Sequence, residues 1–228
     1  MKWEMYSRAQ SADSLVWLLL GYTRLPRLEQ FELAHIWDCD KETGVWKKTS
    51  RLQSSVPPEI LFIERCTQFL APGGRMGIVL PDSILGSPGL GYIREWMIQN
   101  HRIVASIDLN ADTFQPRNGT QTSVLILQKK TQEQRDAEEK SDKMADYNIF
   151  MAMVEKVGHD KRGNPLFKRD KEGNEILVPD TNSVLVLGET GDGQRTVSHE
   201  QKVKVEDDQT PDVPAIFAEW KKQEGLGW

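Results

Sequence analysis

The sequence contains little that would support a disulfide framework or a zinc site. Only two of its 228 residues are cysteines, Cys39 and Cys66, and they are far apart, with no Cys-x-x-Cys or Cys/His spacing around them. Small secreted domains and zinc modules need paired or regularly spaced cysteines, so the reducing cytosol is the expected compartment. The four histidines are scattered without ligand spacing, and no metal site is predicted.

Long apolar runs and an excess of positive charge are also absent. The most apolar stretch, SLVWLLLGY (14–22), is too short to span a bilayer, so no membrane association is expected. The formal net charge is −5, which provides no global basic field to attract nucleic acid. DNA binding stays open nevertheless, because a local groove can be basic on an acidic protein.

From residue 57 onward the sequence shows a clear helical pattern followed by a turn. Pro57 and Pro58 suit the first turn of a helix, and EILFIERCTQFL then has an amphipathic period. This pattern places Phe69 on the apolar stripe and Glu64 on the opposite face. Gly73-Gly74 ends the helix, because glycine tolerates the positive φ angles that a helix stop needs.

Three apolar runs beyond this turn predict strands, and one amphipathic run predicts a helix. RMGIVLP (75–81) is nearly continuous in apolar residues, as in a buried parallel strand. YIREWMIQN (92–100) predicts a helix whose inner face carries Ile93, Trp96 and Met97. RIVASIDL (102–109) and TSVLILQKK (122–130) are the next strands. The order helix, strand, helix, strand, strand implies an open α/β sheet with right-handed crossovers.

The remaining segments are less regular. Residues 30–50 mix aromatic and charged residues and suggest a surface loop or an irregular hairpin, and the charge-rich segment 131–146 predicts a linker or an exposed helix. Within 147–228, two turn signals at 162–165 and 172–174 indicate a small antiparallel meander, and a short amphipathic helix ends the chain. No internal repeat is evident.

Candidate binding residues cluster at predicted strand ends, where ligands bind in an open α/β sheet. Pro81 and Asp82 follow one strand, and Asp108 lies at the end of the next. The loop before the last strand contains Phe114 and Asn118. The Phe114 ring could stack on a planar heterocycle while amide side chains of the loop bind the edge of that heterocycle. Alternatively, the ring could fill the core beneath a tight loop. The two aspartates could act as acid or ligand, or cap the following turns.

The basic residues between 161 and 171 allow two interpretations. They could contact phosphates, but Asp160, Asp170 and Glu172 are interleaved with them. A solvated hairpin face is the simpler reading of such alternating charges.

Three blocks of the sequence resemble a known family. PPEILFIERCTQFLAPGGRMGIVLPDSIL (57–85), YIREWMIQNHRIVASIDL (92–109) and DTFQPRNGTQTSVLILQKK (112–130) resemble the catalytic domain of the N6-adenine DNA methylases. They are most similar to the modification (M) subunit of type I restriction-modification systems. The segment 149–176 and the closing residues resemble that family's tail, so the resemblance covers the chain from roughly residue 28 to its end.

The resemblance implies a partial Rossmann-like sheet of the S-adenosylmethionine-dependent methyltransferases, with the last two strands antiparallel. Members of the family flip an adenine out of double-stranded DNA and methylate its N6 atom. Phe114 would then stack on the flipped base, with Pro81, Asp82 and Asn118 at the border of the target-base pocket. The implied partners are DNA and the specificity and restriction subunits of a type I system.

The sequence departs from the family pattern in its first part. The glycine-rich motif for the cofactor and the Asn-Pro-Pro-Tyr/Phe motif for the target amino group are both absent, and LVWLLLGYTRLP stands where relatives show Asn-Pro-Pro-Phe. No catalytic residue is therefore assigned to this chain. The expectation is a truncated or frameshifted product, or one half of a split enzyme whose other half is a separate chain. The alternative to an enzyme is an inactive fragment that binds DNA or another subunit.

The expected organisation has four segments. They are residues 1–27, which do not match the family; 28–130, the carboxyl-terminal part of the methyltransferase domain; 131–146, the charged linker; and 147–228, an extension with a β-meander and a terminal helix.

Overall fold

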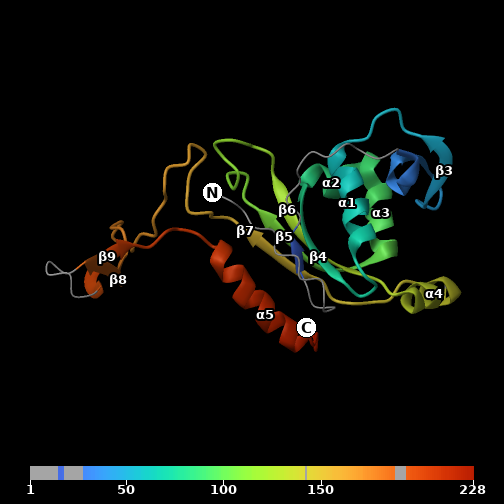
Figure 1. The fold of residues 1–228 in the computed structure, drawn as a ribbon. Coiled ribbons are helices and arrows are strands. Elements are labelled where there is room, and N and C mark those ends of the chain that lie inside the picture. Colours follow the sequence, from blue (N-terminus) through green and yellow to red (C-terminus); the bar gives the residue numbers. More distant parts are fainter. Residues whose placement is uncertain (1–14, 18–27, 142, 188–193) are drawn as a thin grey trace. The chain divides into compact units, whose positions relative to one another are not determined.

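The computed structural model describes residues 15–17, 28–141, 143–187 and 194–228, which form two compact units of a mixed α/β chain (Figure 1). The first unit is built from three segments of the chain: Met1–Leu109, Thr120–Met153 and Pro214–Trp228. The second unit is built from two segments: Asn110–Gly119 and Val154–Val213. Each unit is described by itself below.

A five-stranded mixed sheet forms the centre of the first unit, with strand order β1-β4-β6-β5-β7. Its strands are β1 (Leu15–Trp17), β4 (Arg75–Pro81), β5 (His101–Leu109), β6 (Thr122–Lys129) and β7 (Phe150–Val154). β6 runs antiparallel to both β4 and β5, and β1 runs parallel to β4. The three strands predicted from apolar runs are confirmed, as is the antiparallel pairing of the last two. Apart from β1, residues 1–27 lie outside the described residues.

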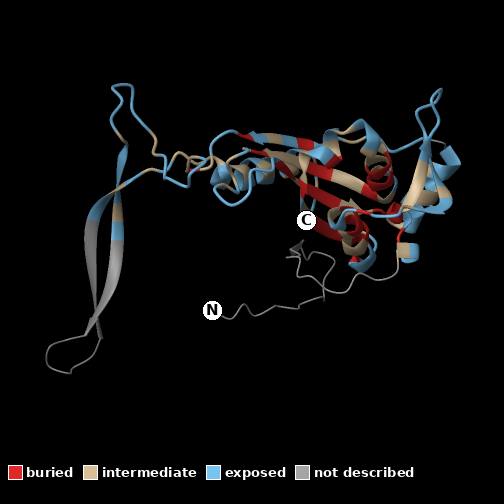
Figure 2. Ribbon diagram, turned by 90° about the horizontal axis from the view of Figure 1, so that it is seen from above, coloured by how far each residue is buried: buried red, intermediate tan, exposed pale blue. Residues whose placement is uncertain are grey.

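Three helices connect β4 to its neighbours in the chain and supply about half of the core. They are α1 (Pro58–Phe69), α2 (Asp82–Gly86) and α3 (Gly91–Asn100). Buried residues gather in these helices and in the sheet (Figure 2). The inner face predicted for α3 is confirmed, because Ile93, Trp96 and Met97 are all buried. Short 3-10 helices occur at Leu28–Gln30, Glu32–Ala34, Pro88–Leu90 and Thr210–Asp212.

The face predicted for α1 is wrong at two positions. Phe69 is 70% exposed, whereas Glu64 is only 4% exposed. The Glu64 carboxylate accepts hydrogen bonds from the backbone N–H groups of Glu32 (3.0 Å) and Leu33 (2.9 Å) at the start of a 3-10 helix. A buried carboxylate needs such partners, and burial, the largest influence, raises its pKa.

An irregular antiparallel hairpin, one of the two structures predicted for 30–50, packs on α3. It consists of β2 (His35–Cys39) and β3 (Trp46–Leu52), with a register shift in β2. The ring of Trp37 stacks on Tyr92 at 5.9 Å between centroids. A Cβ placed on Gly91 would lie 2.7 Å from Trp46 Nε1, so the absence of a side chain at Gly91 lets the hairpin approach the helix.

Two neighbouring lysines at the exit of β6 bind the carboxyl ends of two helices. Lys129 Nζ donates to the carbonyl oxygens of Thr67 (2.9 Å) and Leu70 (2.7 Å) at the end of α1. Lys130 Nζ donates to the carbonyl oxygen of Ile98 (2.8 Å) near the end of α3. Carbonyls in the last turn of a helix lack the usual partner four residues further on, although that of Thr67 also accepts the Leu70 N–H (3.2 Å). A cation there also interacts favourably with the helix dipole.

Two further helices belong to the carboxyl-terminal half. α4 (Gln132–Ser141) contains no buried residue, so the charged segment forms the exposed helix that was one of its two predicted structures. α5 (Val213–Gln223) packs its Phe217 and Trp220 rings on Phe150 of β7, at 5.2 and 5.6 Å between centroids. No helix in the described part of the chain is both long and apolar enough to cross a membrane.

The second unit contains the long antiparallel hairpin of β8 (Leu177–Leu187) and β9 (Gln194–Lys204). Before it lie two tight turns, each closed by an isolated antiparallel bridge: His159↔Pro165 closes the first and Arg169↔Glu175 the second, in agreement with the predicted meander. Among the residues of this unit whose burial is described, only Val154, at the end of β7, and Gly158 are buried.

Candidate functional site

Pro81 and Asp82 lie where the chain passes from β4 into α2, at the carboxyl edge of the sheet. The Asp82 N–H donates to the carbonyl oxygen of Gln121 (3.1 Å). Its carboxylate accepts a hydrogen bond from the buried Ser123 hydroxyl (2.8 Å), and no side chain caps α2. Asp82 therefore ties β4 to β6 instead of capping the next turn.

Asp108 lies at the same edge, near the end of β5. Its Oδ1 atom accepts a hydrogen bond from Gln121 Nε2 at 3.3 Å, and its partner in the sheet register is Ser123. The neighbouring Thr122, which pairs with Pro81, is 7% exposed, and its hydroxyl has no hydrogen-bond partner in the part of the chain that the structure describes. The edge thus combines two half-buried carboxylates with a buried hydroxyl that has no partner among the described residues.

The loop that contains Phe114 is compact and holds its ring at the surface. Phe114 is 43% exposed, so the interpretation that it fills the core is wrong. Its carbonyl oxygen accepts hydrogen bonds from the N–H groups of Arg117 (3.2 Å) and Asn118 (3.0 Å). The Thr113 N–H and hydroxyl both donate to the carbonyl oxygen of Asn110, at 2.9 and 2.6 Å. The backbone of this loop therefore fixes the residues next to the exposed ring.

Two turns of the second unit have the same structure, although no repeat was predicted from the sequence. Asp160 Oδ1 accepts from the N–H groups of Arg162 (2.8 Å) and Asn164 (2.9 Å). Asp170 Oδ1 accepts in the same way from Glu172 (3.0 Å) and Asn174 (2.8 Å). Hydrogen bonds from Asn164, through its side chain and its backbone, lower the pKa of Asp160. The common letters DKxGN at 160–164 and 170–174 were the available signal.

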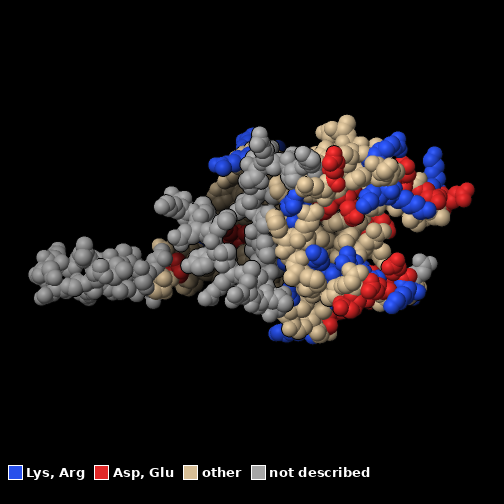
Figure 3. Space-filling view, turned by 45° about the vertical axis from the view of Figure 1, so that its right-hand side comes forward, with Lys and Arg blue, Asp and Glu red and all other residues tan. Residues whose placement is uncertain are grey.

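Charge on the described surface is mixed. Acidic and basic side chains are interspersed on the face shown in Figure 3. Several form exposed ion pairs, such as Lys48–Glu32 at 2.8 Å and Lys204–Glu175 at 2.7 Å. Among the described residues, no group of three or more His, Cys, Asp or Glu side chains could hold a metal ion.

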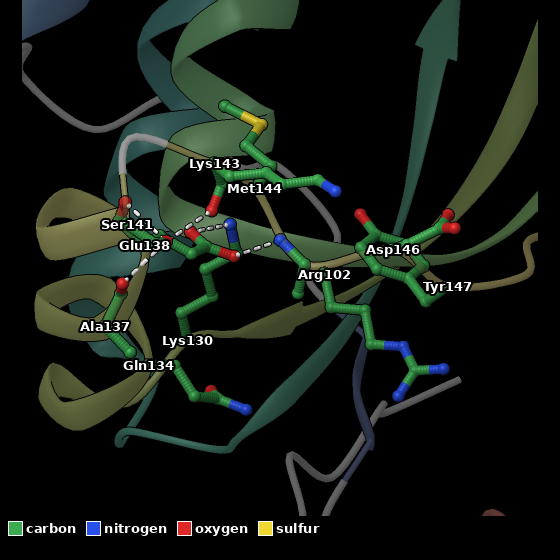
Figure 4. Close-up of a pocket in the computed structure, with 11 residues that line it drawn as sticks. Arg102, Lys130, Gln134, Ala137, Glu138, Ser141, Lys143, Met144, Asp146 and Tyr147 are labelled. Atoms are coloured by element: carbon green, nitrogen blue, oxygen red, sulfur yellow. Dashed lines mark hydrogen bonds and ion pairs between the residues drawn. The ribbon is translucent and has the colours of Figure 1, made fainter.

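A cavity of about 570 Å³ lies in the first unit, between α4 and the segment that follows it (Figure 4). The Lys130 ammonium forms an ion pair with Glu138 at 2.6 Å on its wall, and the Arg102 guanidinium lies 5.0 Å from the centroid of the Tyr147 ring. Lys130 follows the end of β6 and Arg102 lies near the start of β5, so this cavity is at the sheet edge opposite to Asp82 and Asp108.

The four residues predicted to border a target-base site belong to different units. Pro81 and Asp82 are in the first unit, and Phe114 and Asn118 are in the second. The structure brings Asp82 together with Ser123, which the sequence analysis did not single out. The polar start of the strand 122–129 was the signal that could have identified it.

The described residues do not form a cradle for S-adenosylmethionine, the cofactor implied by the resemblance. Cβ atoms placed on Gly86 and Gly89, after β4, would meet no atom within 4 Å. A Cβ on Gly91 would clash with Trp46, so that glycine makes room for the protein's own side chain. The free hydroxyl of Thr122 is a single polar group, which is too little to bind an adenosine and a methionine moiety.

Comparison with known proteins yields one family match. The model of the N-6 DNA Methylase family matches residues 34–173, which include α1 to α3, the sheet edge, the Phe114 loop, the first turn and all but the last residue of the second. A search of the curated proteins finds no match.

Several solved structures are similar to part of this chain. One is described as a class I S-adenosylmethionine-dependent methyltransferase from Listeria monocytogenes, with 20% identity, coverage of 46% of this chain and 30% of that one, and a TM-score of 0.35. The M protein of the type I restriction enzyme EcoKI is 28% identical over 34% of this chain and 16% of its own, with a TM-score of 0.31. A modification subunit assigned to a type I restriction enzyme of Vibrio vulnificus YJ016 is 16% identical over 50% and 22%, with a TM-score of 0.30.

This chain therefore spans less than a third of the length of each of these proteins. The family match, by contrast, extends over more than half of its 228 residues. The chain belongs to the N-6 DNA Methylase family.

Proposed function

We propose that this chain contains the carboxyl-terminal part of the catalytic domain of a site-specific DNA adenine-N6 methyltransferase, of the modification-subunit type. The observation that carries the proposal is the exposed Phe114 ring on a compact loop inside the family match. An adenine extruded from a duplex loses its stacking neighbours, and an exposed aromatic face replaces them. Asn118, four residues further on, supplies an amide for the base edge, and the resemblance to the family assigns Pro81 and Asp82 to the border of the target-base site.

The complete enzyme is cytoplasmic, uses S-adenosylmethionine as methyl donor and acts on double-stranded DNA together with specificity and restriction subunits. In the family, most of the cofactor site lies on a glycine-rich strand and an Asn-Pro-Pro-Tyr/Phe strand, and this sequence lacks both motifs. This chain alone should therefore bind S-adenosylmethionine negligibly and transfer no methyl group. Calorimetry with the full chain would contradict this expectation by measuring a micromolar affinity.

A second function is supported by the absence of both motifs from the sequence. The chain would then be a catalytically inactive fragment that acts at most as a DNA- or subunit-binding module. The two functions differ in the outcome of reconstitution, because only the first predicts that a polypeptide with the missing motifs restores methylation.

The role of Phe114 is tested in the reconstituted enzyme with 2-aminopurine at the target position. Removing the ring in Phe114→Ala should weaken capture of the base by about 1–3 kcal/mol, the usual value of one base–aromatic stack. The extruded base should then stay bright, because stacking quenches its fluorescence. Phe114→Trp should retain the quenching, since it keeps an aromatic face.

Phe69→Ala is the matched control, because it removes an equally large ring that is 70% exposed on α1. It should change neither the fluorescence nor the rate of methylation. Equal effects of the two alanine variants would remove Phe114 from the site.

A further inference from the structure

The loop Asn110–Gly119, here called the target-base loop, belongs to the second unit, although β5 and β6 on either side of it belong to the first. Asn110 Nδ2 donates to the carbonyl oxygen of Glu155 at 2.6 Å. At the tip, Pro116 packs against Gly163, where an added Cβ would lie 3.3 Å from Pro116 Cδ. The loop therefore rests on the residues that follow β7 at its base and its tip.

The tip rests on the first turn, Asp160–Asn164. Besides the two backbone N–H groups that it accepts, Asp160 accepts a hydrogen bond from Asn164 Nδ2 at 2.9 Å. Gly163 has φ +82°, a conformation that residues with a side chain rarely adopt. Next to this contact lies a polar cavity of about 360 Å³. Its lining combines the loop and the turn: Gln115, Val157, Gly158, His159, Gly163, Pro165 and Glu206.

The second turn, Asp170–Asn174, has the same hydrogen bonds but no such contact. Asn174 Nδ2 donates to Asp170 Oδ2 at 3.3 Å, and Gly173 has φ +89°. A Cβ placed on Gly173 would meet no atom within 4 Å. The chain thus contains two turns of equal construction, of which only the first touches the target-base loop through its glycine.

We infer that the first turn positions the target-base loop, with Gly163 and Asp160 as positioning residues for Phe114. Gly163 allows Pro116 to approach, and Pro116 lies two residues from Phe114. Asp160 fixes the backbone on both sides of Gly163, so the surface on which Pro116 rests keeps one shape. The inference rests on the proposed function for the role of the ring, but the contact between turn and loop can be tested without DNA.

The first test compares Gly163→Ala with Gly173→Ala in the full chain by hydrogen exchange. Both variants strain a turn by placing a Cβ at positive φ, and each should speed exchange within its own turn. Only Gly163→Ala should also speed exchange of the Arg117 and Asn118 amides, by about tenfold, because it alone adds a Cβ against Pro116. Equal exchange of these amides in the two variants would overturn the inference.

The second test uses Asp160 and reports on the ring itself. Asp160→Asn keeps an oxygen that accepts the two N–H groups and should behave as the parent chain, whereas Asp160→Ala should loosen the loop. Asp170→Ala is the matched control. In the reconstituted enzyme, quenching of 2-aminopurine should fall with Asp160→Ala, stay with Asp160→Asn and stay with Asp170→Ala.

The two tests separate the inference from the proposed function. If no variant or parent chain quenches 2-aminopurine, the function proposed for Phe114 fails, while the exchange of Arg117 and Asn118 still decides whether the first turn holds the loop. If quenching falls equally with Asp160→Ala and Asp170→Ala, the first turn has no special role.

Discussion

The first unit buries a continuous set of apolar side chains between α1, α3 and the sheet. In the second unit, among the residues whose burial is described, only Val154 and Gly158 are buried. The second unit instead contains the same local arrangement twice: an aspartate carboxylate accepts hydrogen bonds from backbone N–H groups of its own turn. Hydrophobic burial is cooperative over a whole core, while such hydrogen bonds stabilise only a few residues. The comparison indicates that the target-base loop is held by local order, and that the global stability of the chain is set elsewhere.

The largest expected difference between the units comes from truncating one aliphatic side chain in each. Ile63→Ala should lower the free energy of unfolding by about 2–5 kcal/mol, because Ile63 is fully buried in α1 and leaves a cavity. Leu166→Ala should change it by no more than about 0.5 kcal/mol, since Leu166 is 48% exposed beside the first turn. Urea denaturation of both variants measures this. Similar losses would show that the second unit has a core of its own.

A smaller effect should depend on pH and arise in the first unit alone. Burial, with a lesser influence from Lys129 and Lys130, lowers the pKa of His101 to about 4, although its backbone contact with Met97 acts in the other direction. The ring is fully buried, with Nδ1 3.2 Å from the Met97 carbonyl oxygen and Nε2 3.0 Å from the Thr67 hydroxyl. A neutral ring protonated at Nδ1 donates to the Met97 carbonyl oxygen, while Nε2 shares the Thr67 hydroxyl proton with the Ile63 carbonyl oxygen, which lies 2.8 Å from that hydroxyl.

Because the folded pKa of His101 is below the unfolded value of about 6.5, its contribution to stability is complete above pH 6.5 and is lost as the pH falls toward 4. Between pH 7 and pH 5 the free energy of unfolding should fall by about 2 kcal/mol. Urea midpoints at the two pH values measure it, and His101→Gln should remove most of the difference. An unchanged pH dependence in the variant would assign it to other groups. Protonation of His101 should leave the protection of backbone amides against hydrogen exchange in the second unit unchanged.

The smallest expected effect is confined to one turn. Asp170→Ala should leave the melting temperature of the chain unchanged and raise exchange of the Glu172 and Asn174 amides by about tenfold at most, because these N–H groups lose their acceptor. Hydrogen exchange measured by mass spectrometry reports it. A lower melting temperature would show that the turn is coupled to the first unit.

The sequence predicts structure correctly where a segment is buried along its whole length. It fails where a residue contacts a partner that is distant in the chain. The apolar runs 75–81 and 122–129 identify their strands, since a strand with two covered faces must be apolar throughout. The amphipathic pattern of α1, however, predicted Glu64 on the solvent-exposed face of the helix. Its partners, the N–H groups of Glu32 and Leu33, lie more than thirty residues away, and no local pattern reports such a contact.

The candidate site could be predicted only in part, for a similar reason. Strand ends identified Asp82 and Asp108, because chemistry in an open sheet collects there. The hydrogen bond from Ser123 to Asp82 depends on the register of β4 against β6, which the sequence does not reveal. The support of Phe114 was missed as well, since Gly163 and Pro116 are separated by β6, α4 and β7 in the chain.

The neighbouring lysines at the exit of β6 have a consequence for chemical modification. An acyl group on a surface lysine usually changes only the local charge. Here acetylation of Lys129 would remove a cation from the end of α1, and acetylation of Lys130 would remove one from the end of α3. Lys130 is only 5% exposed, so an amine reagent would reach it when the end of α3 opens locally, and the acyl group would then keep that end from closing on β6 again.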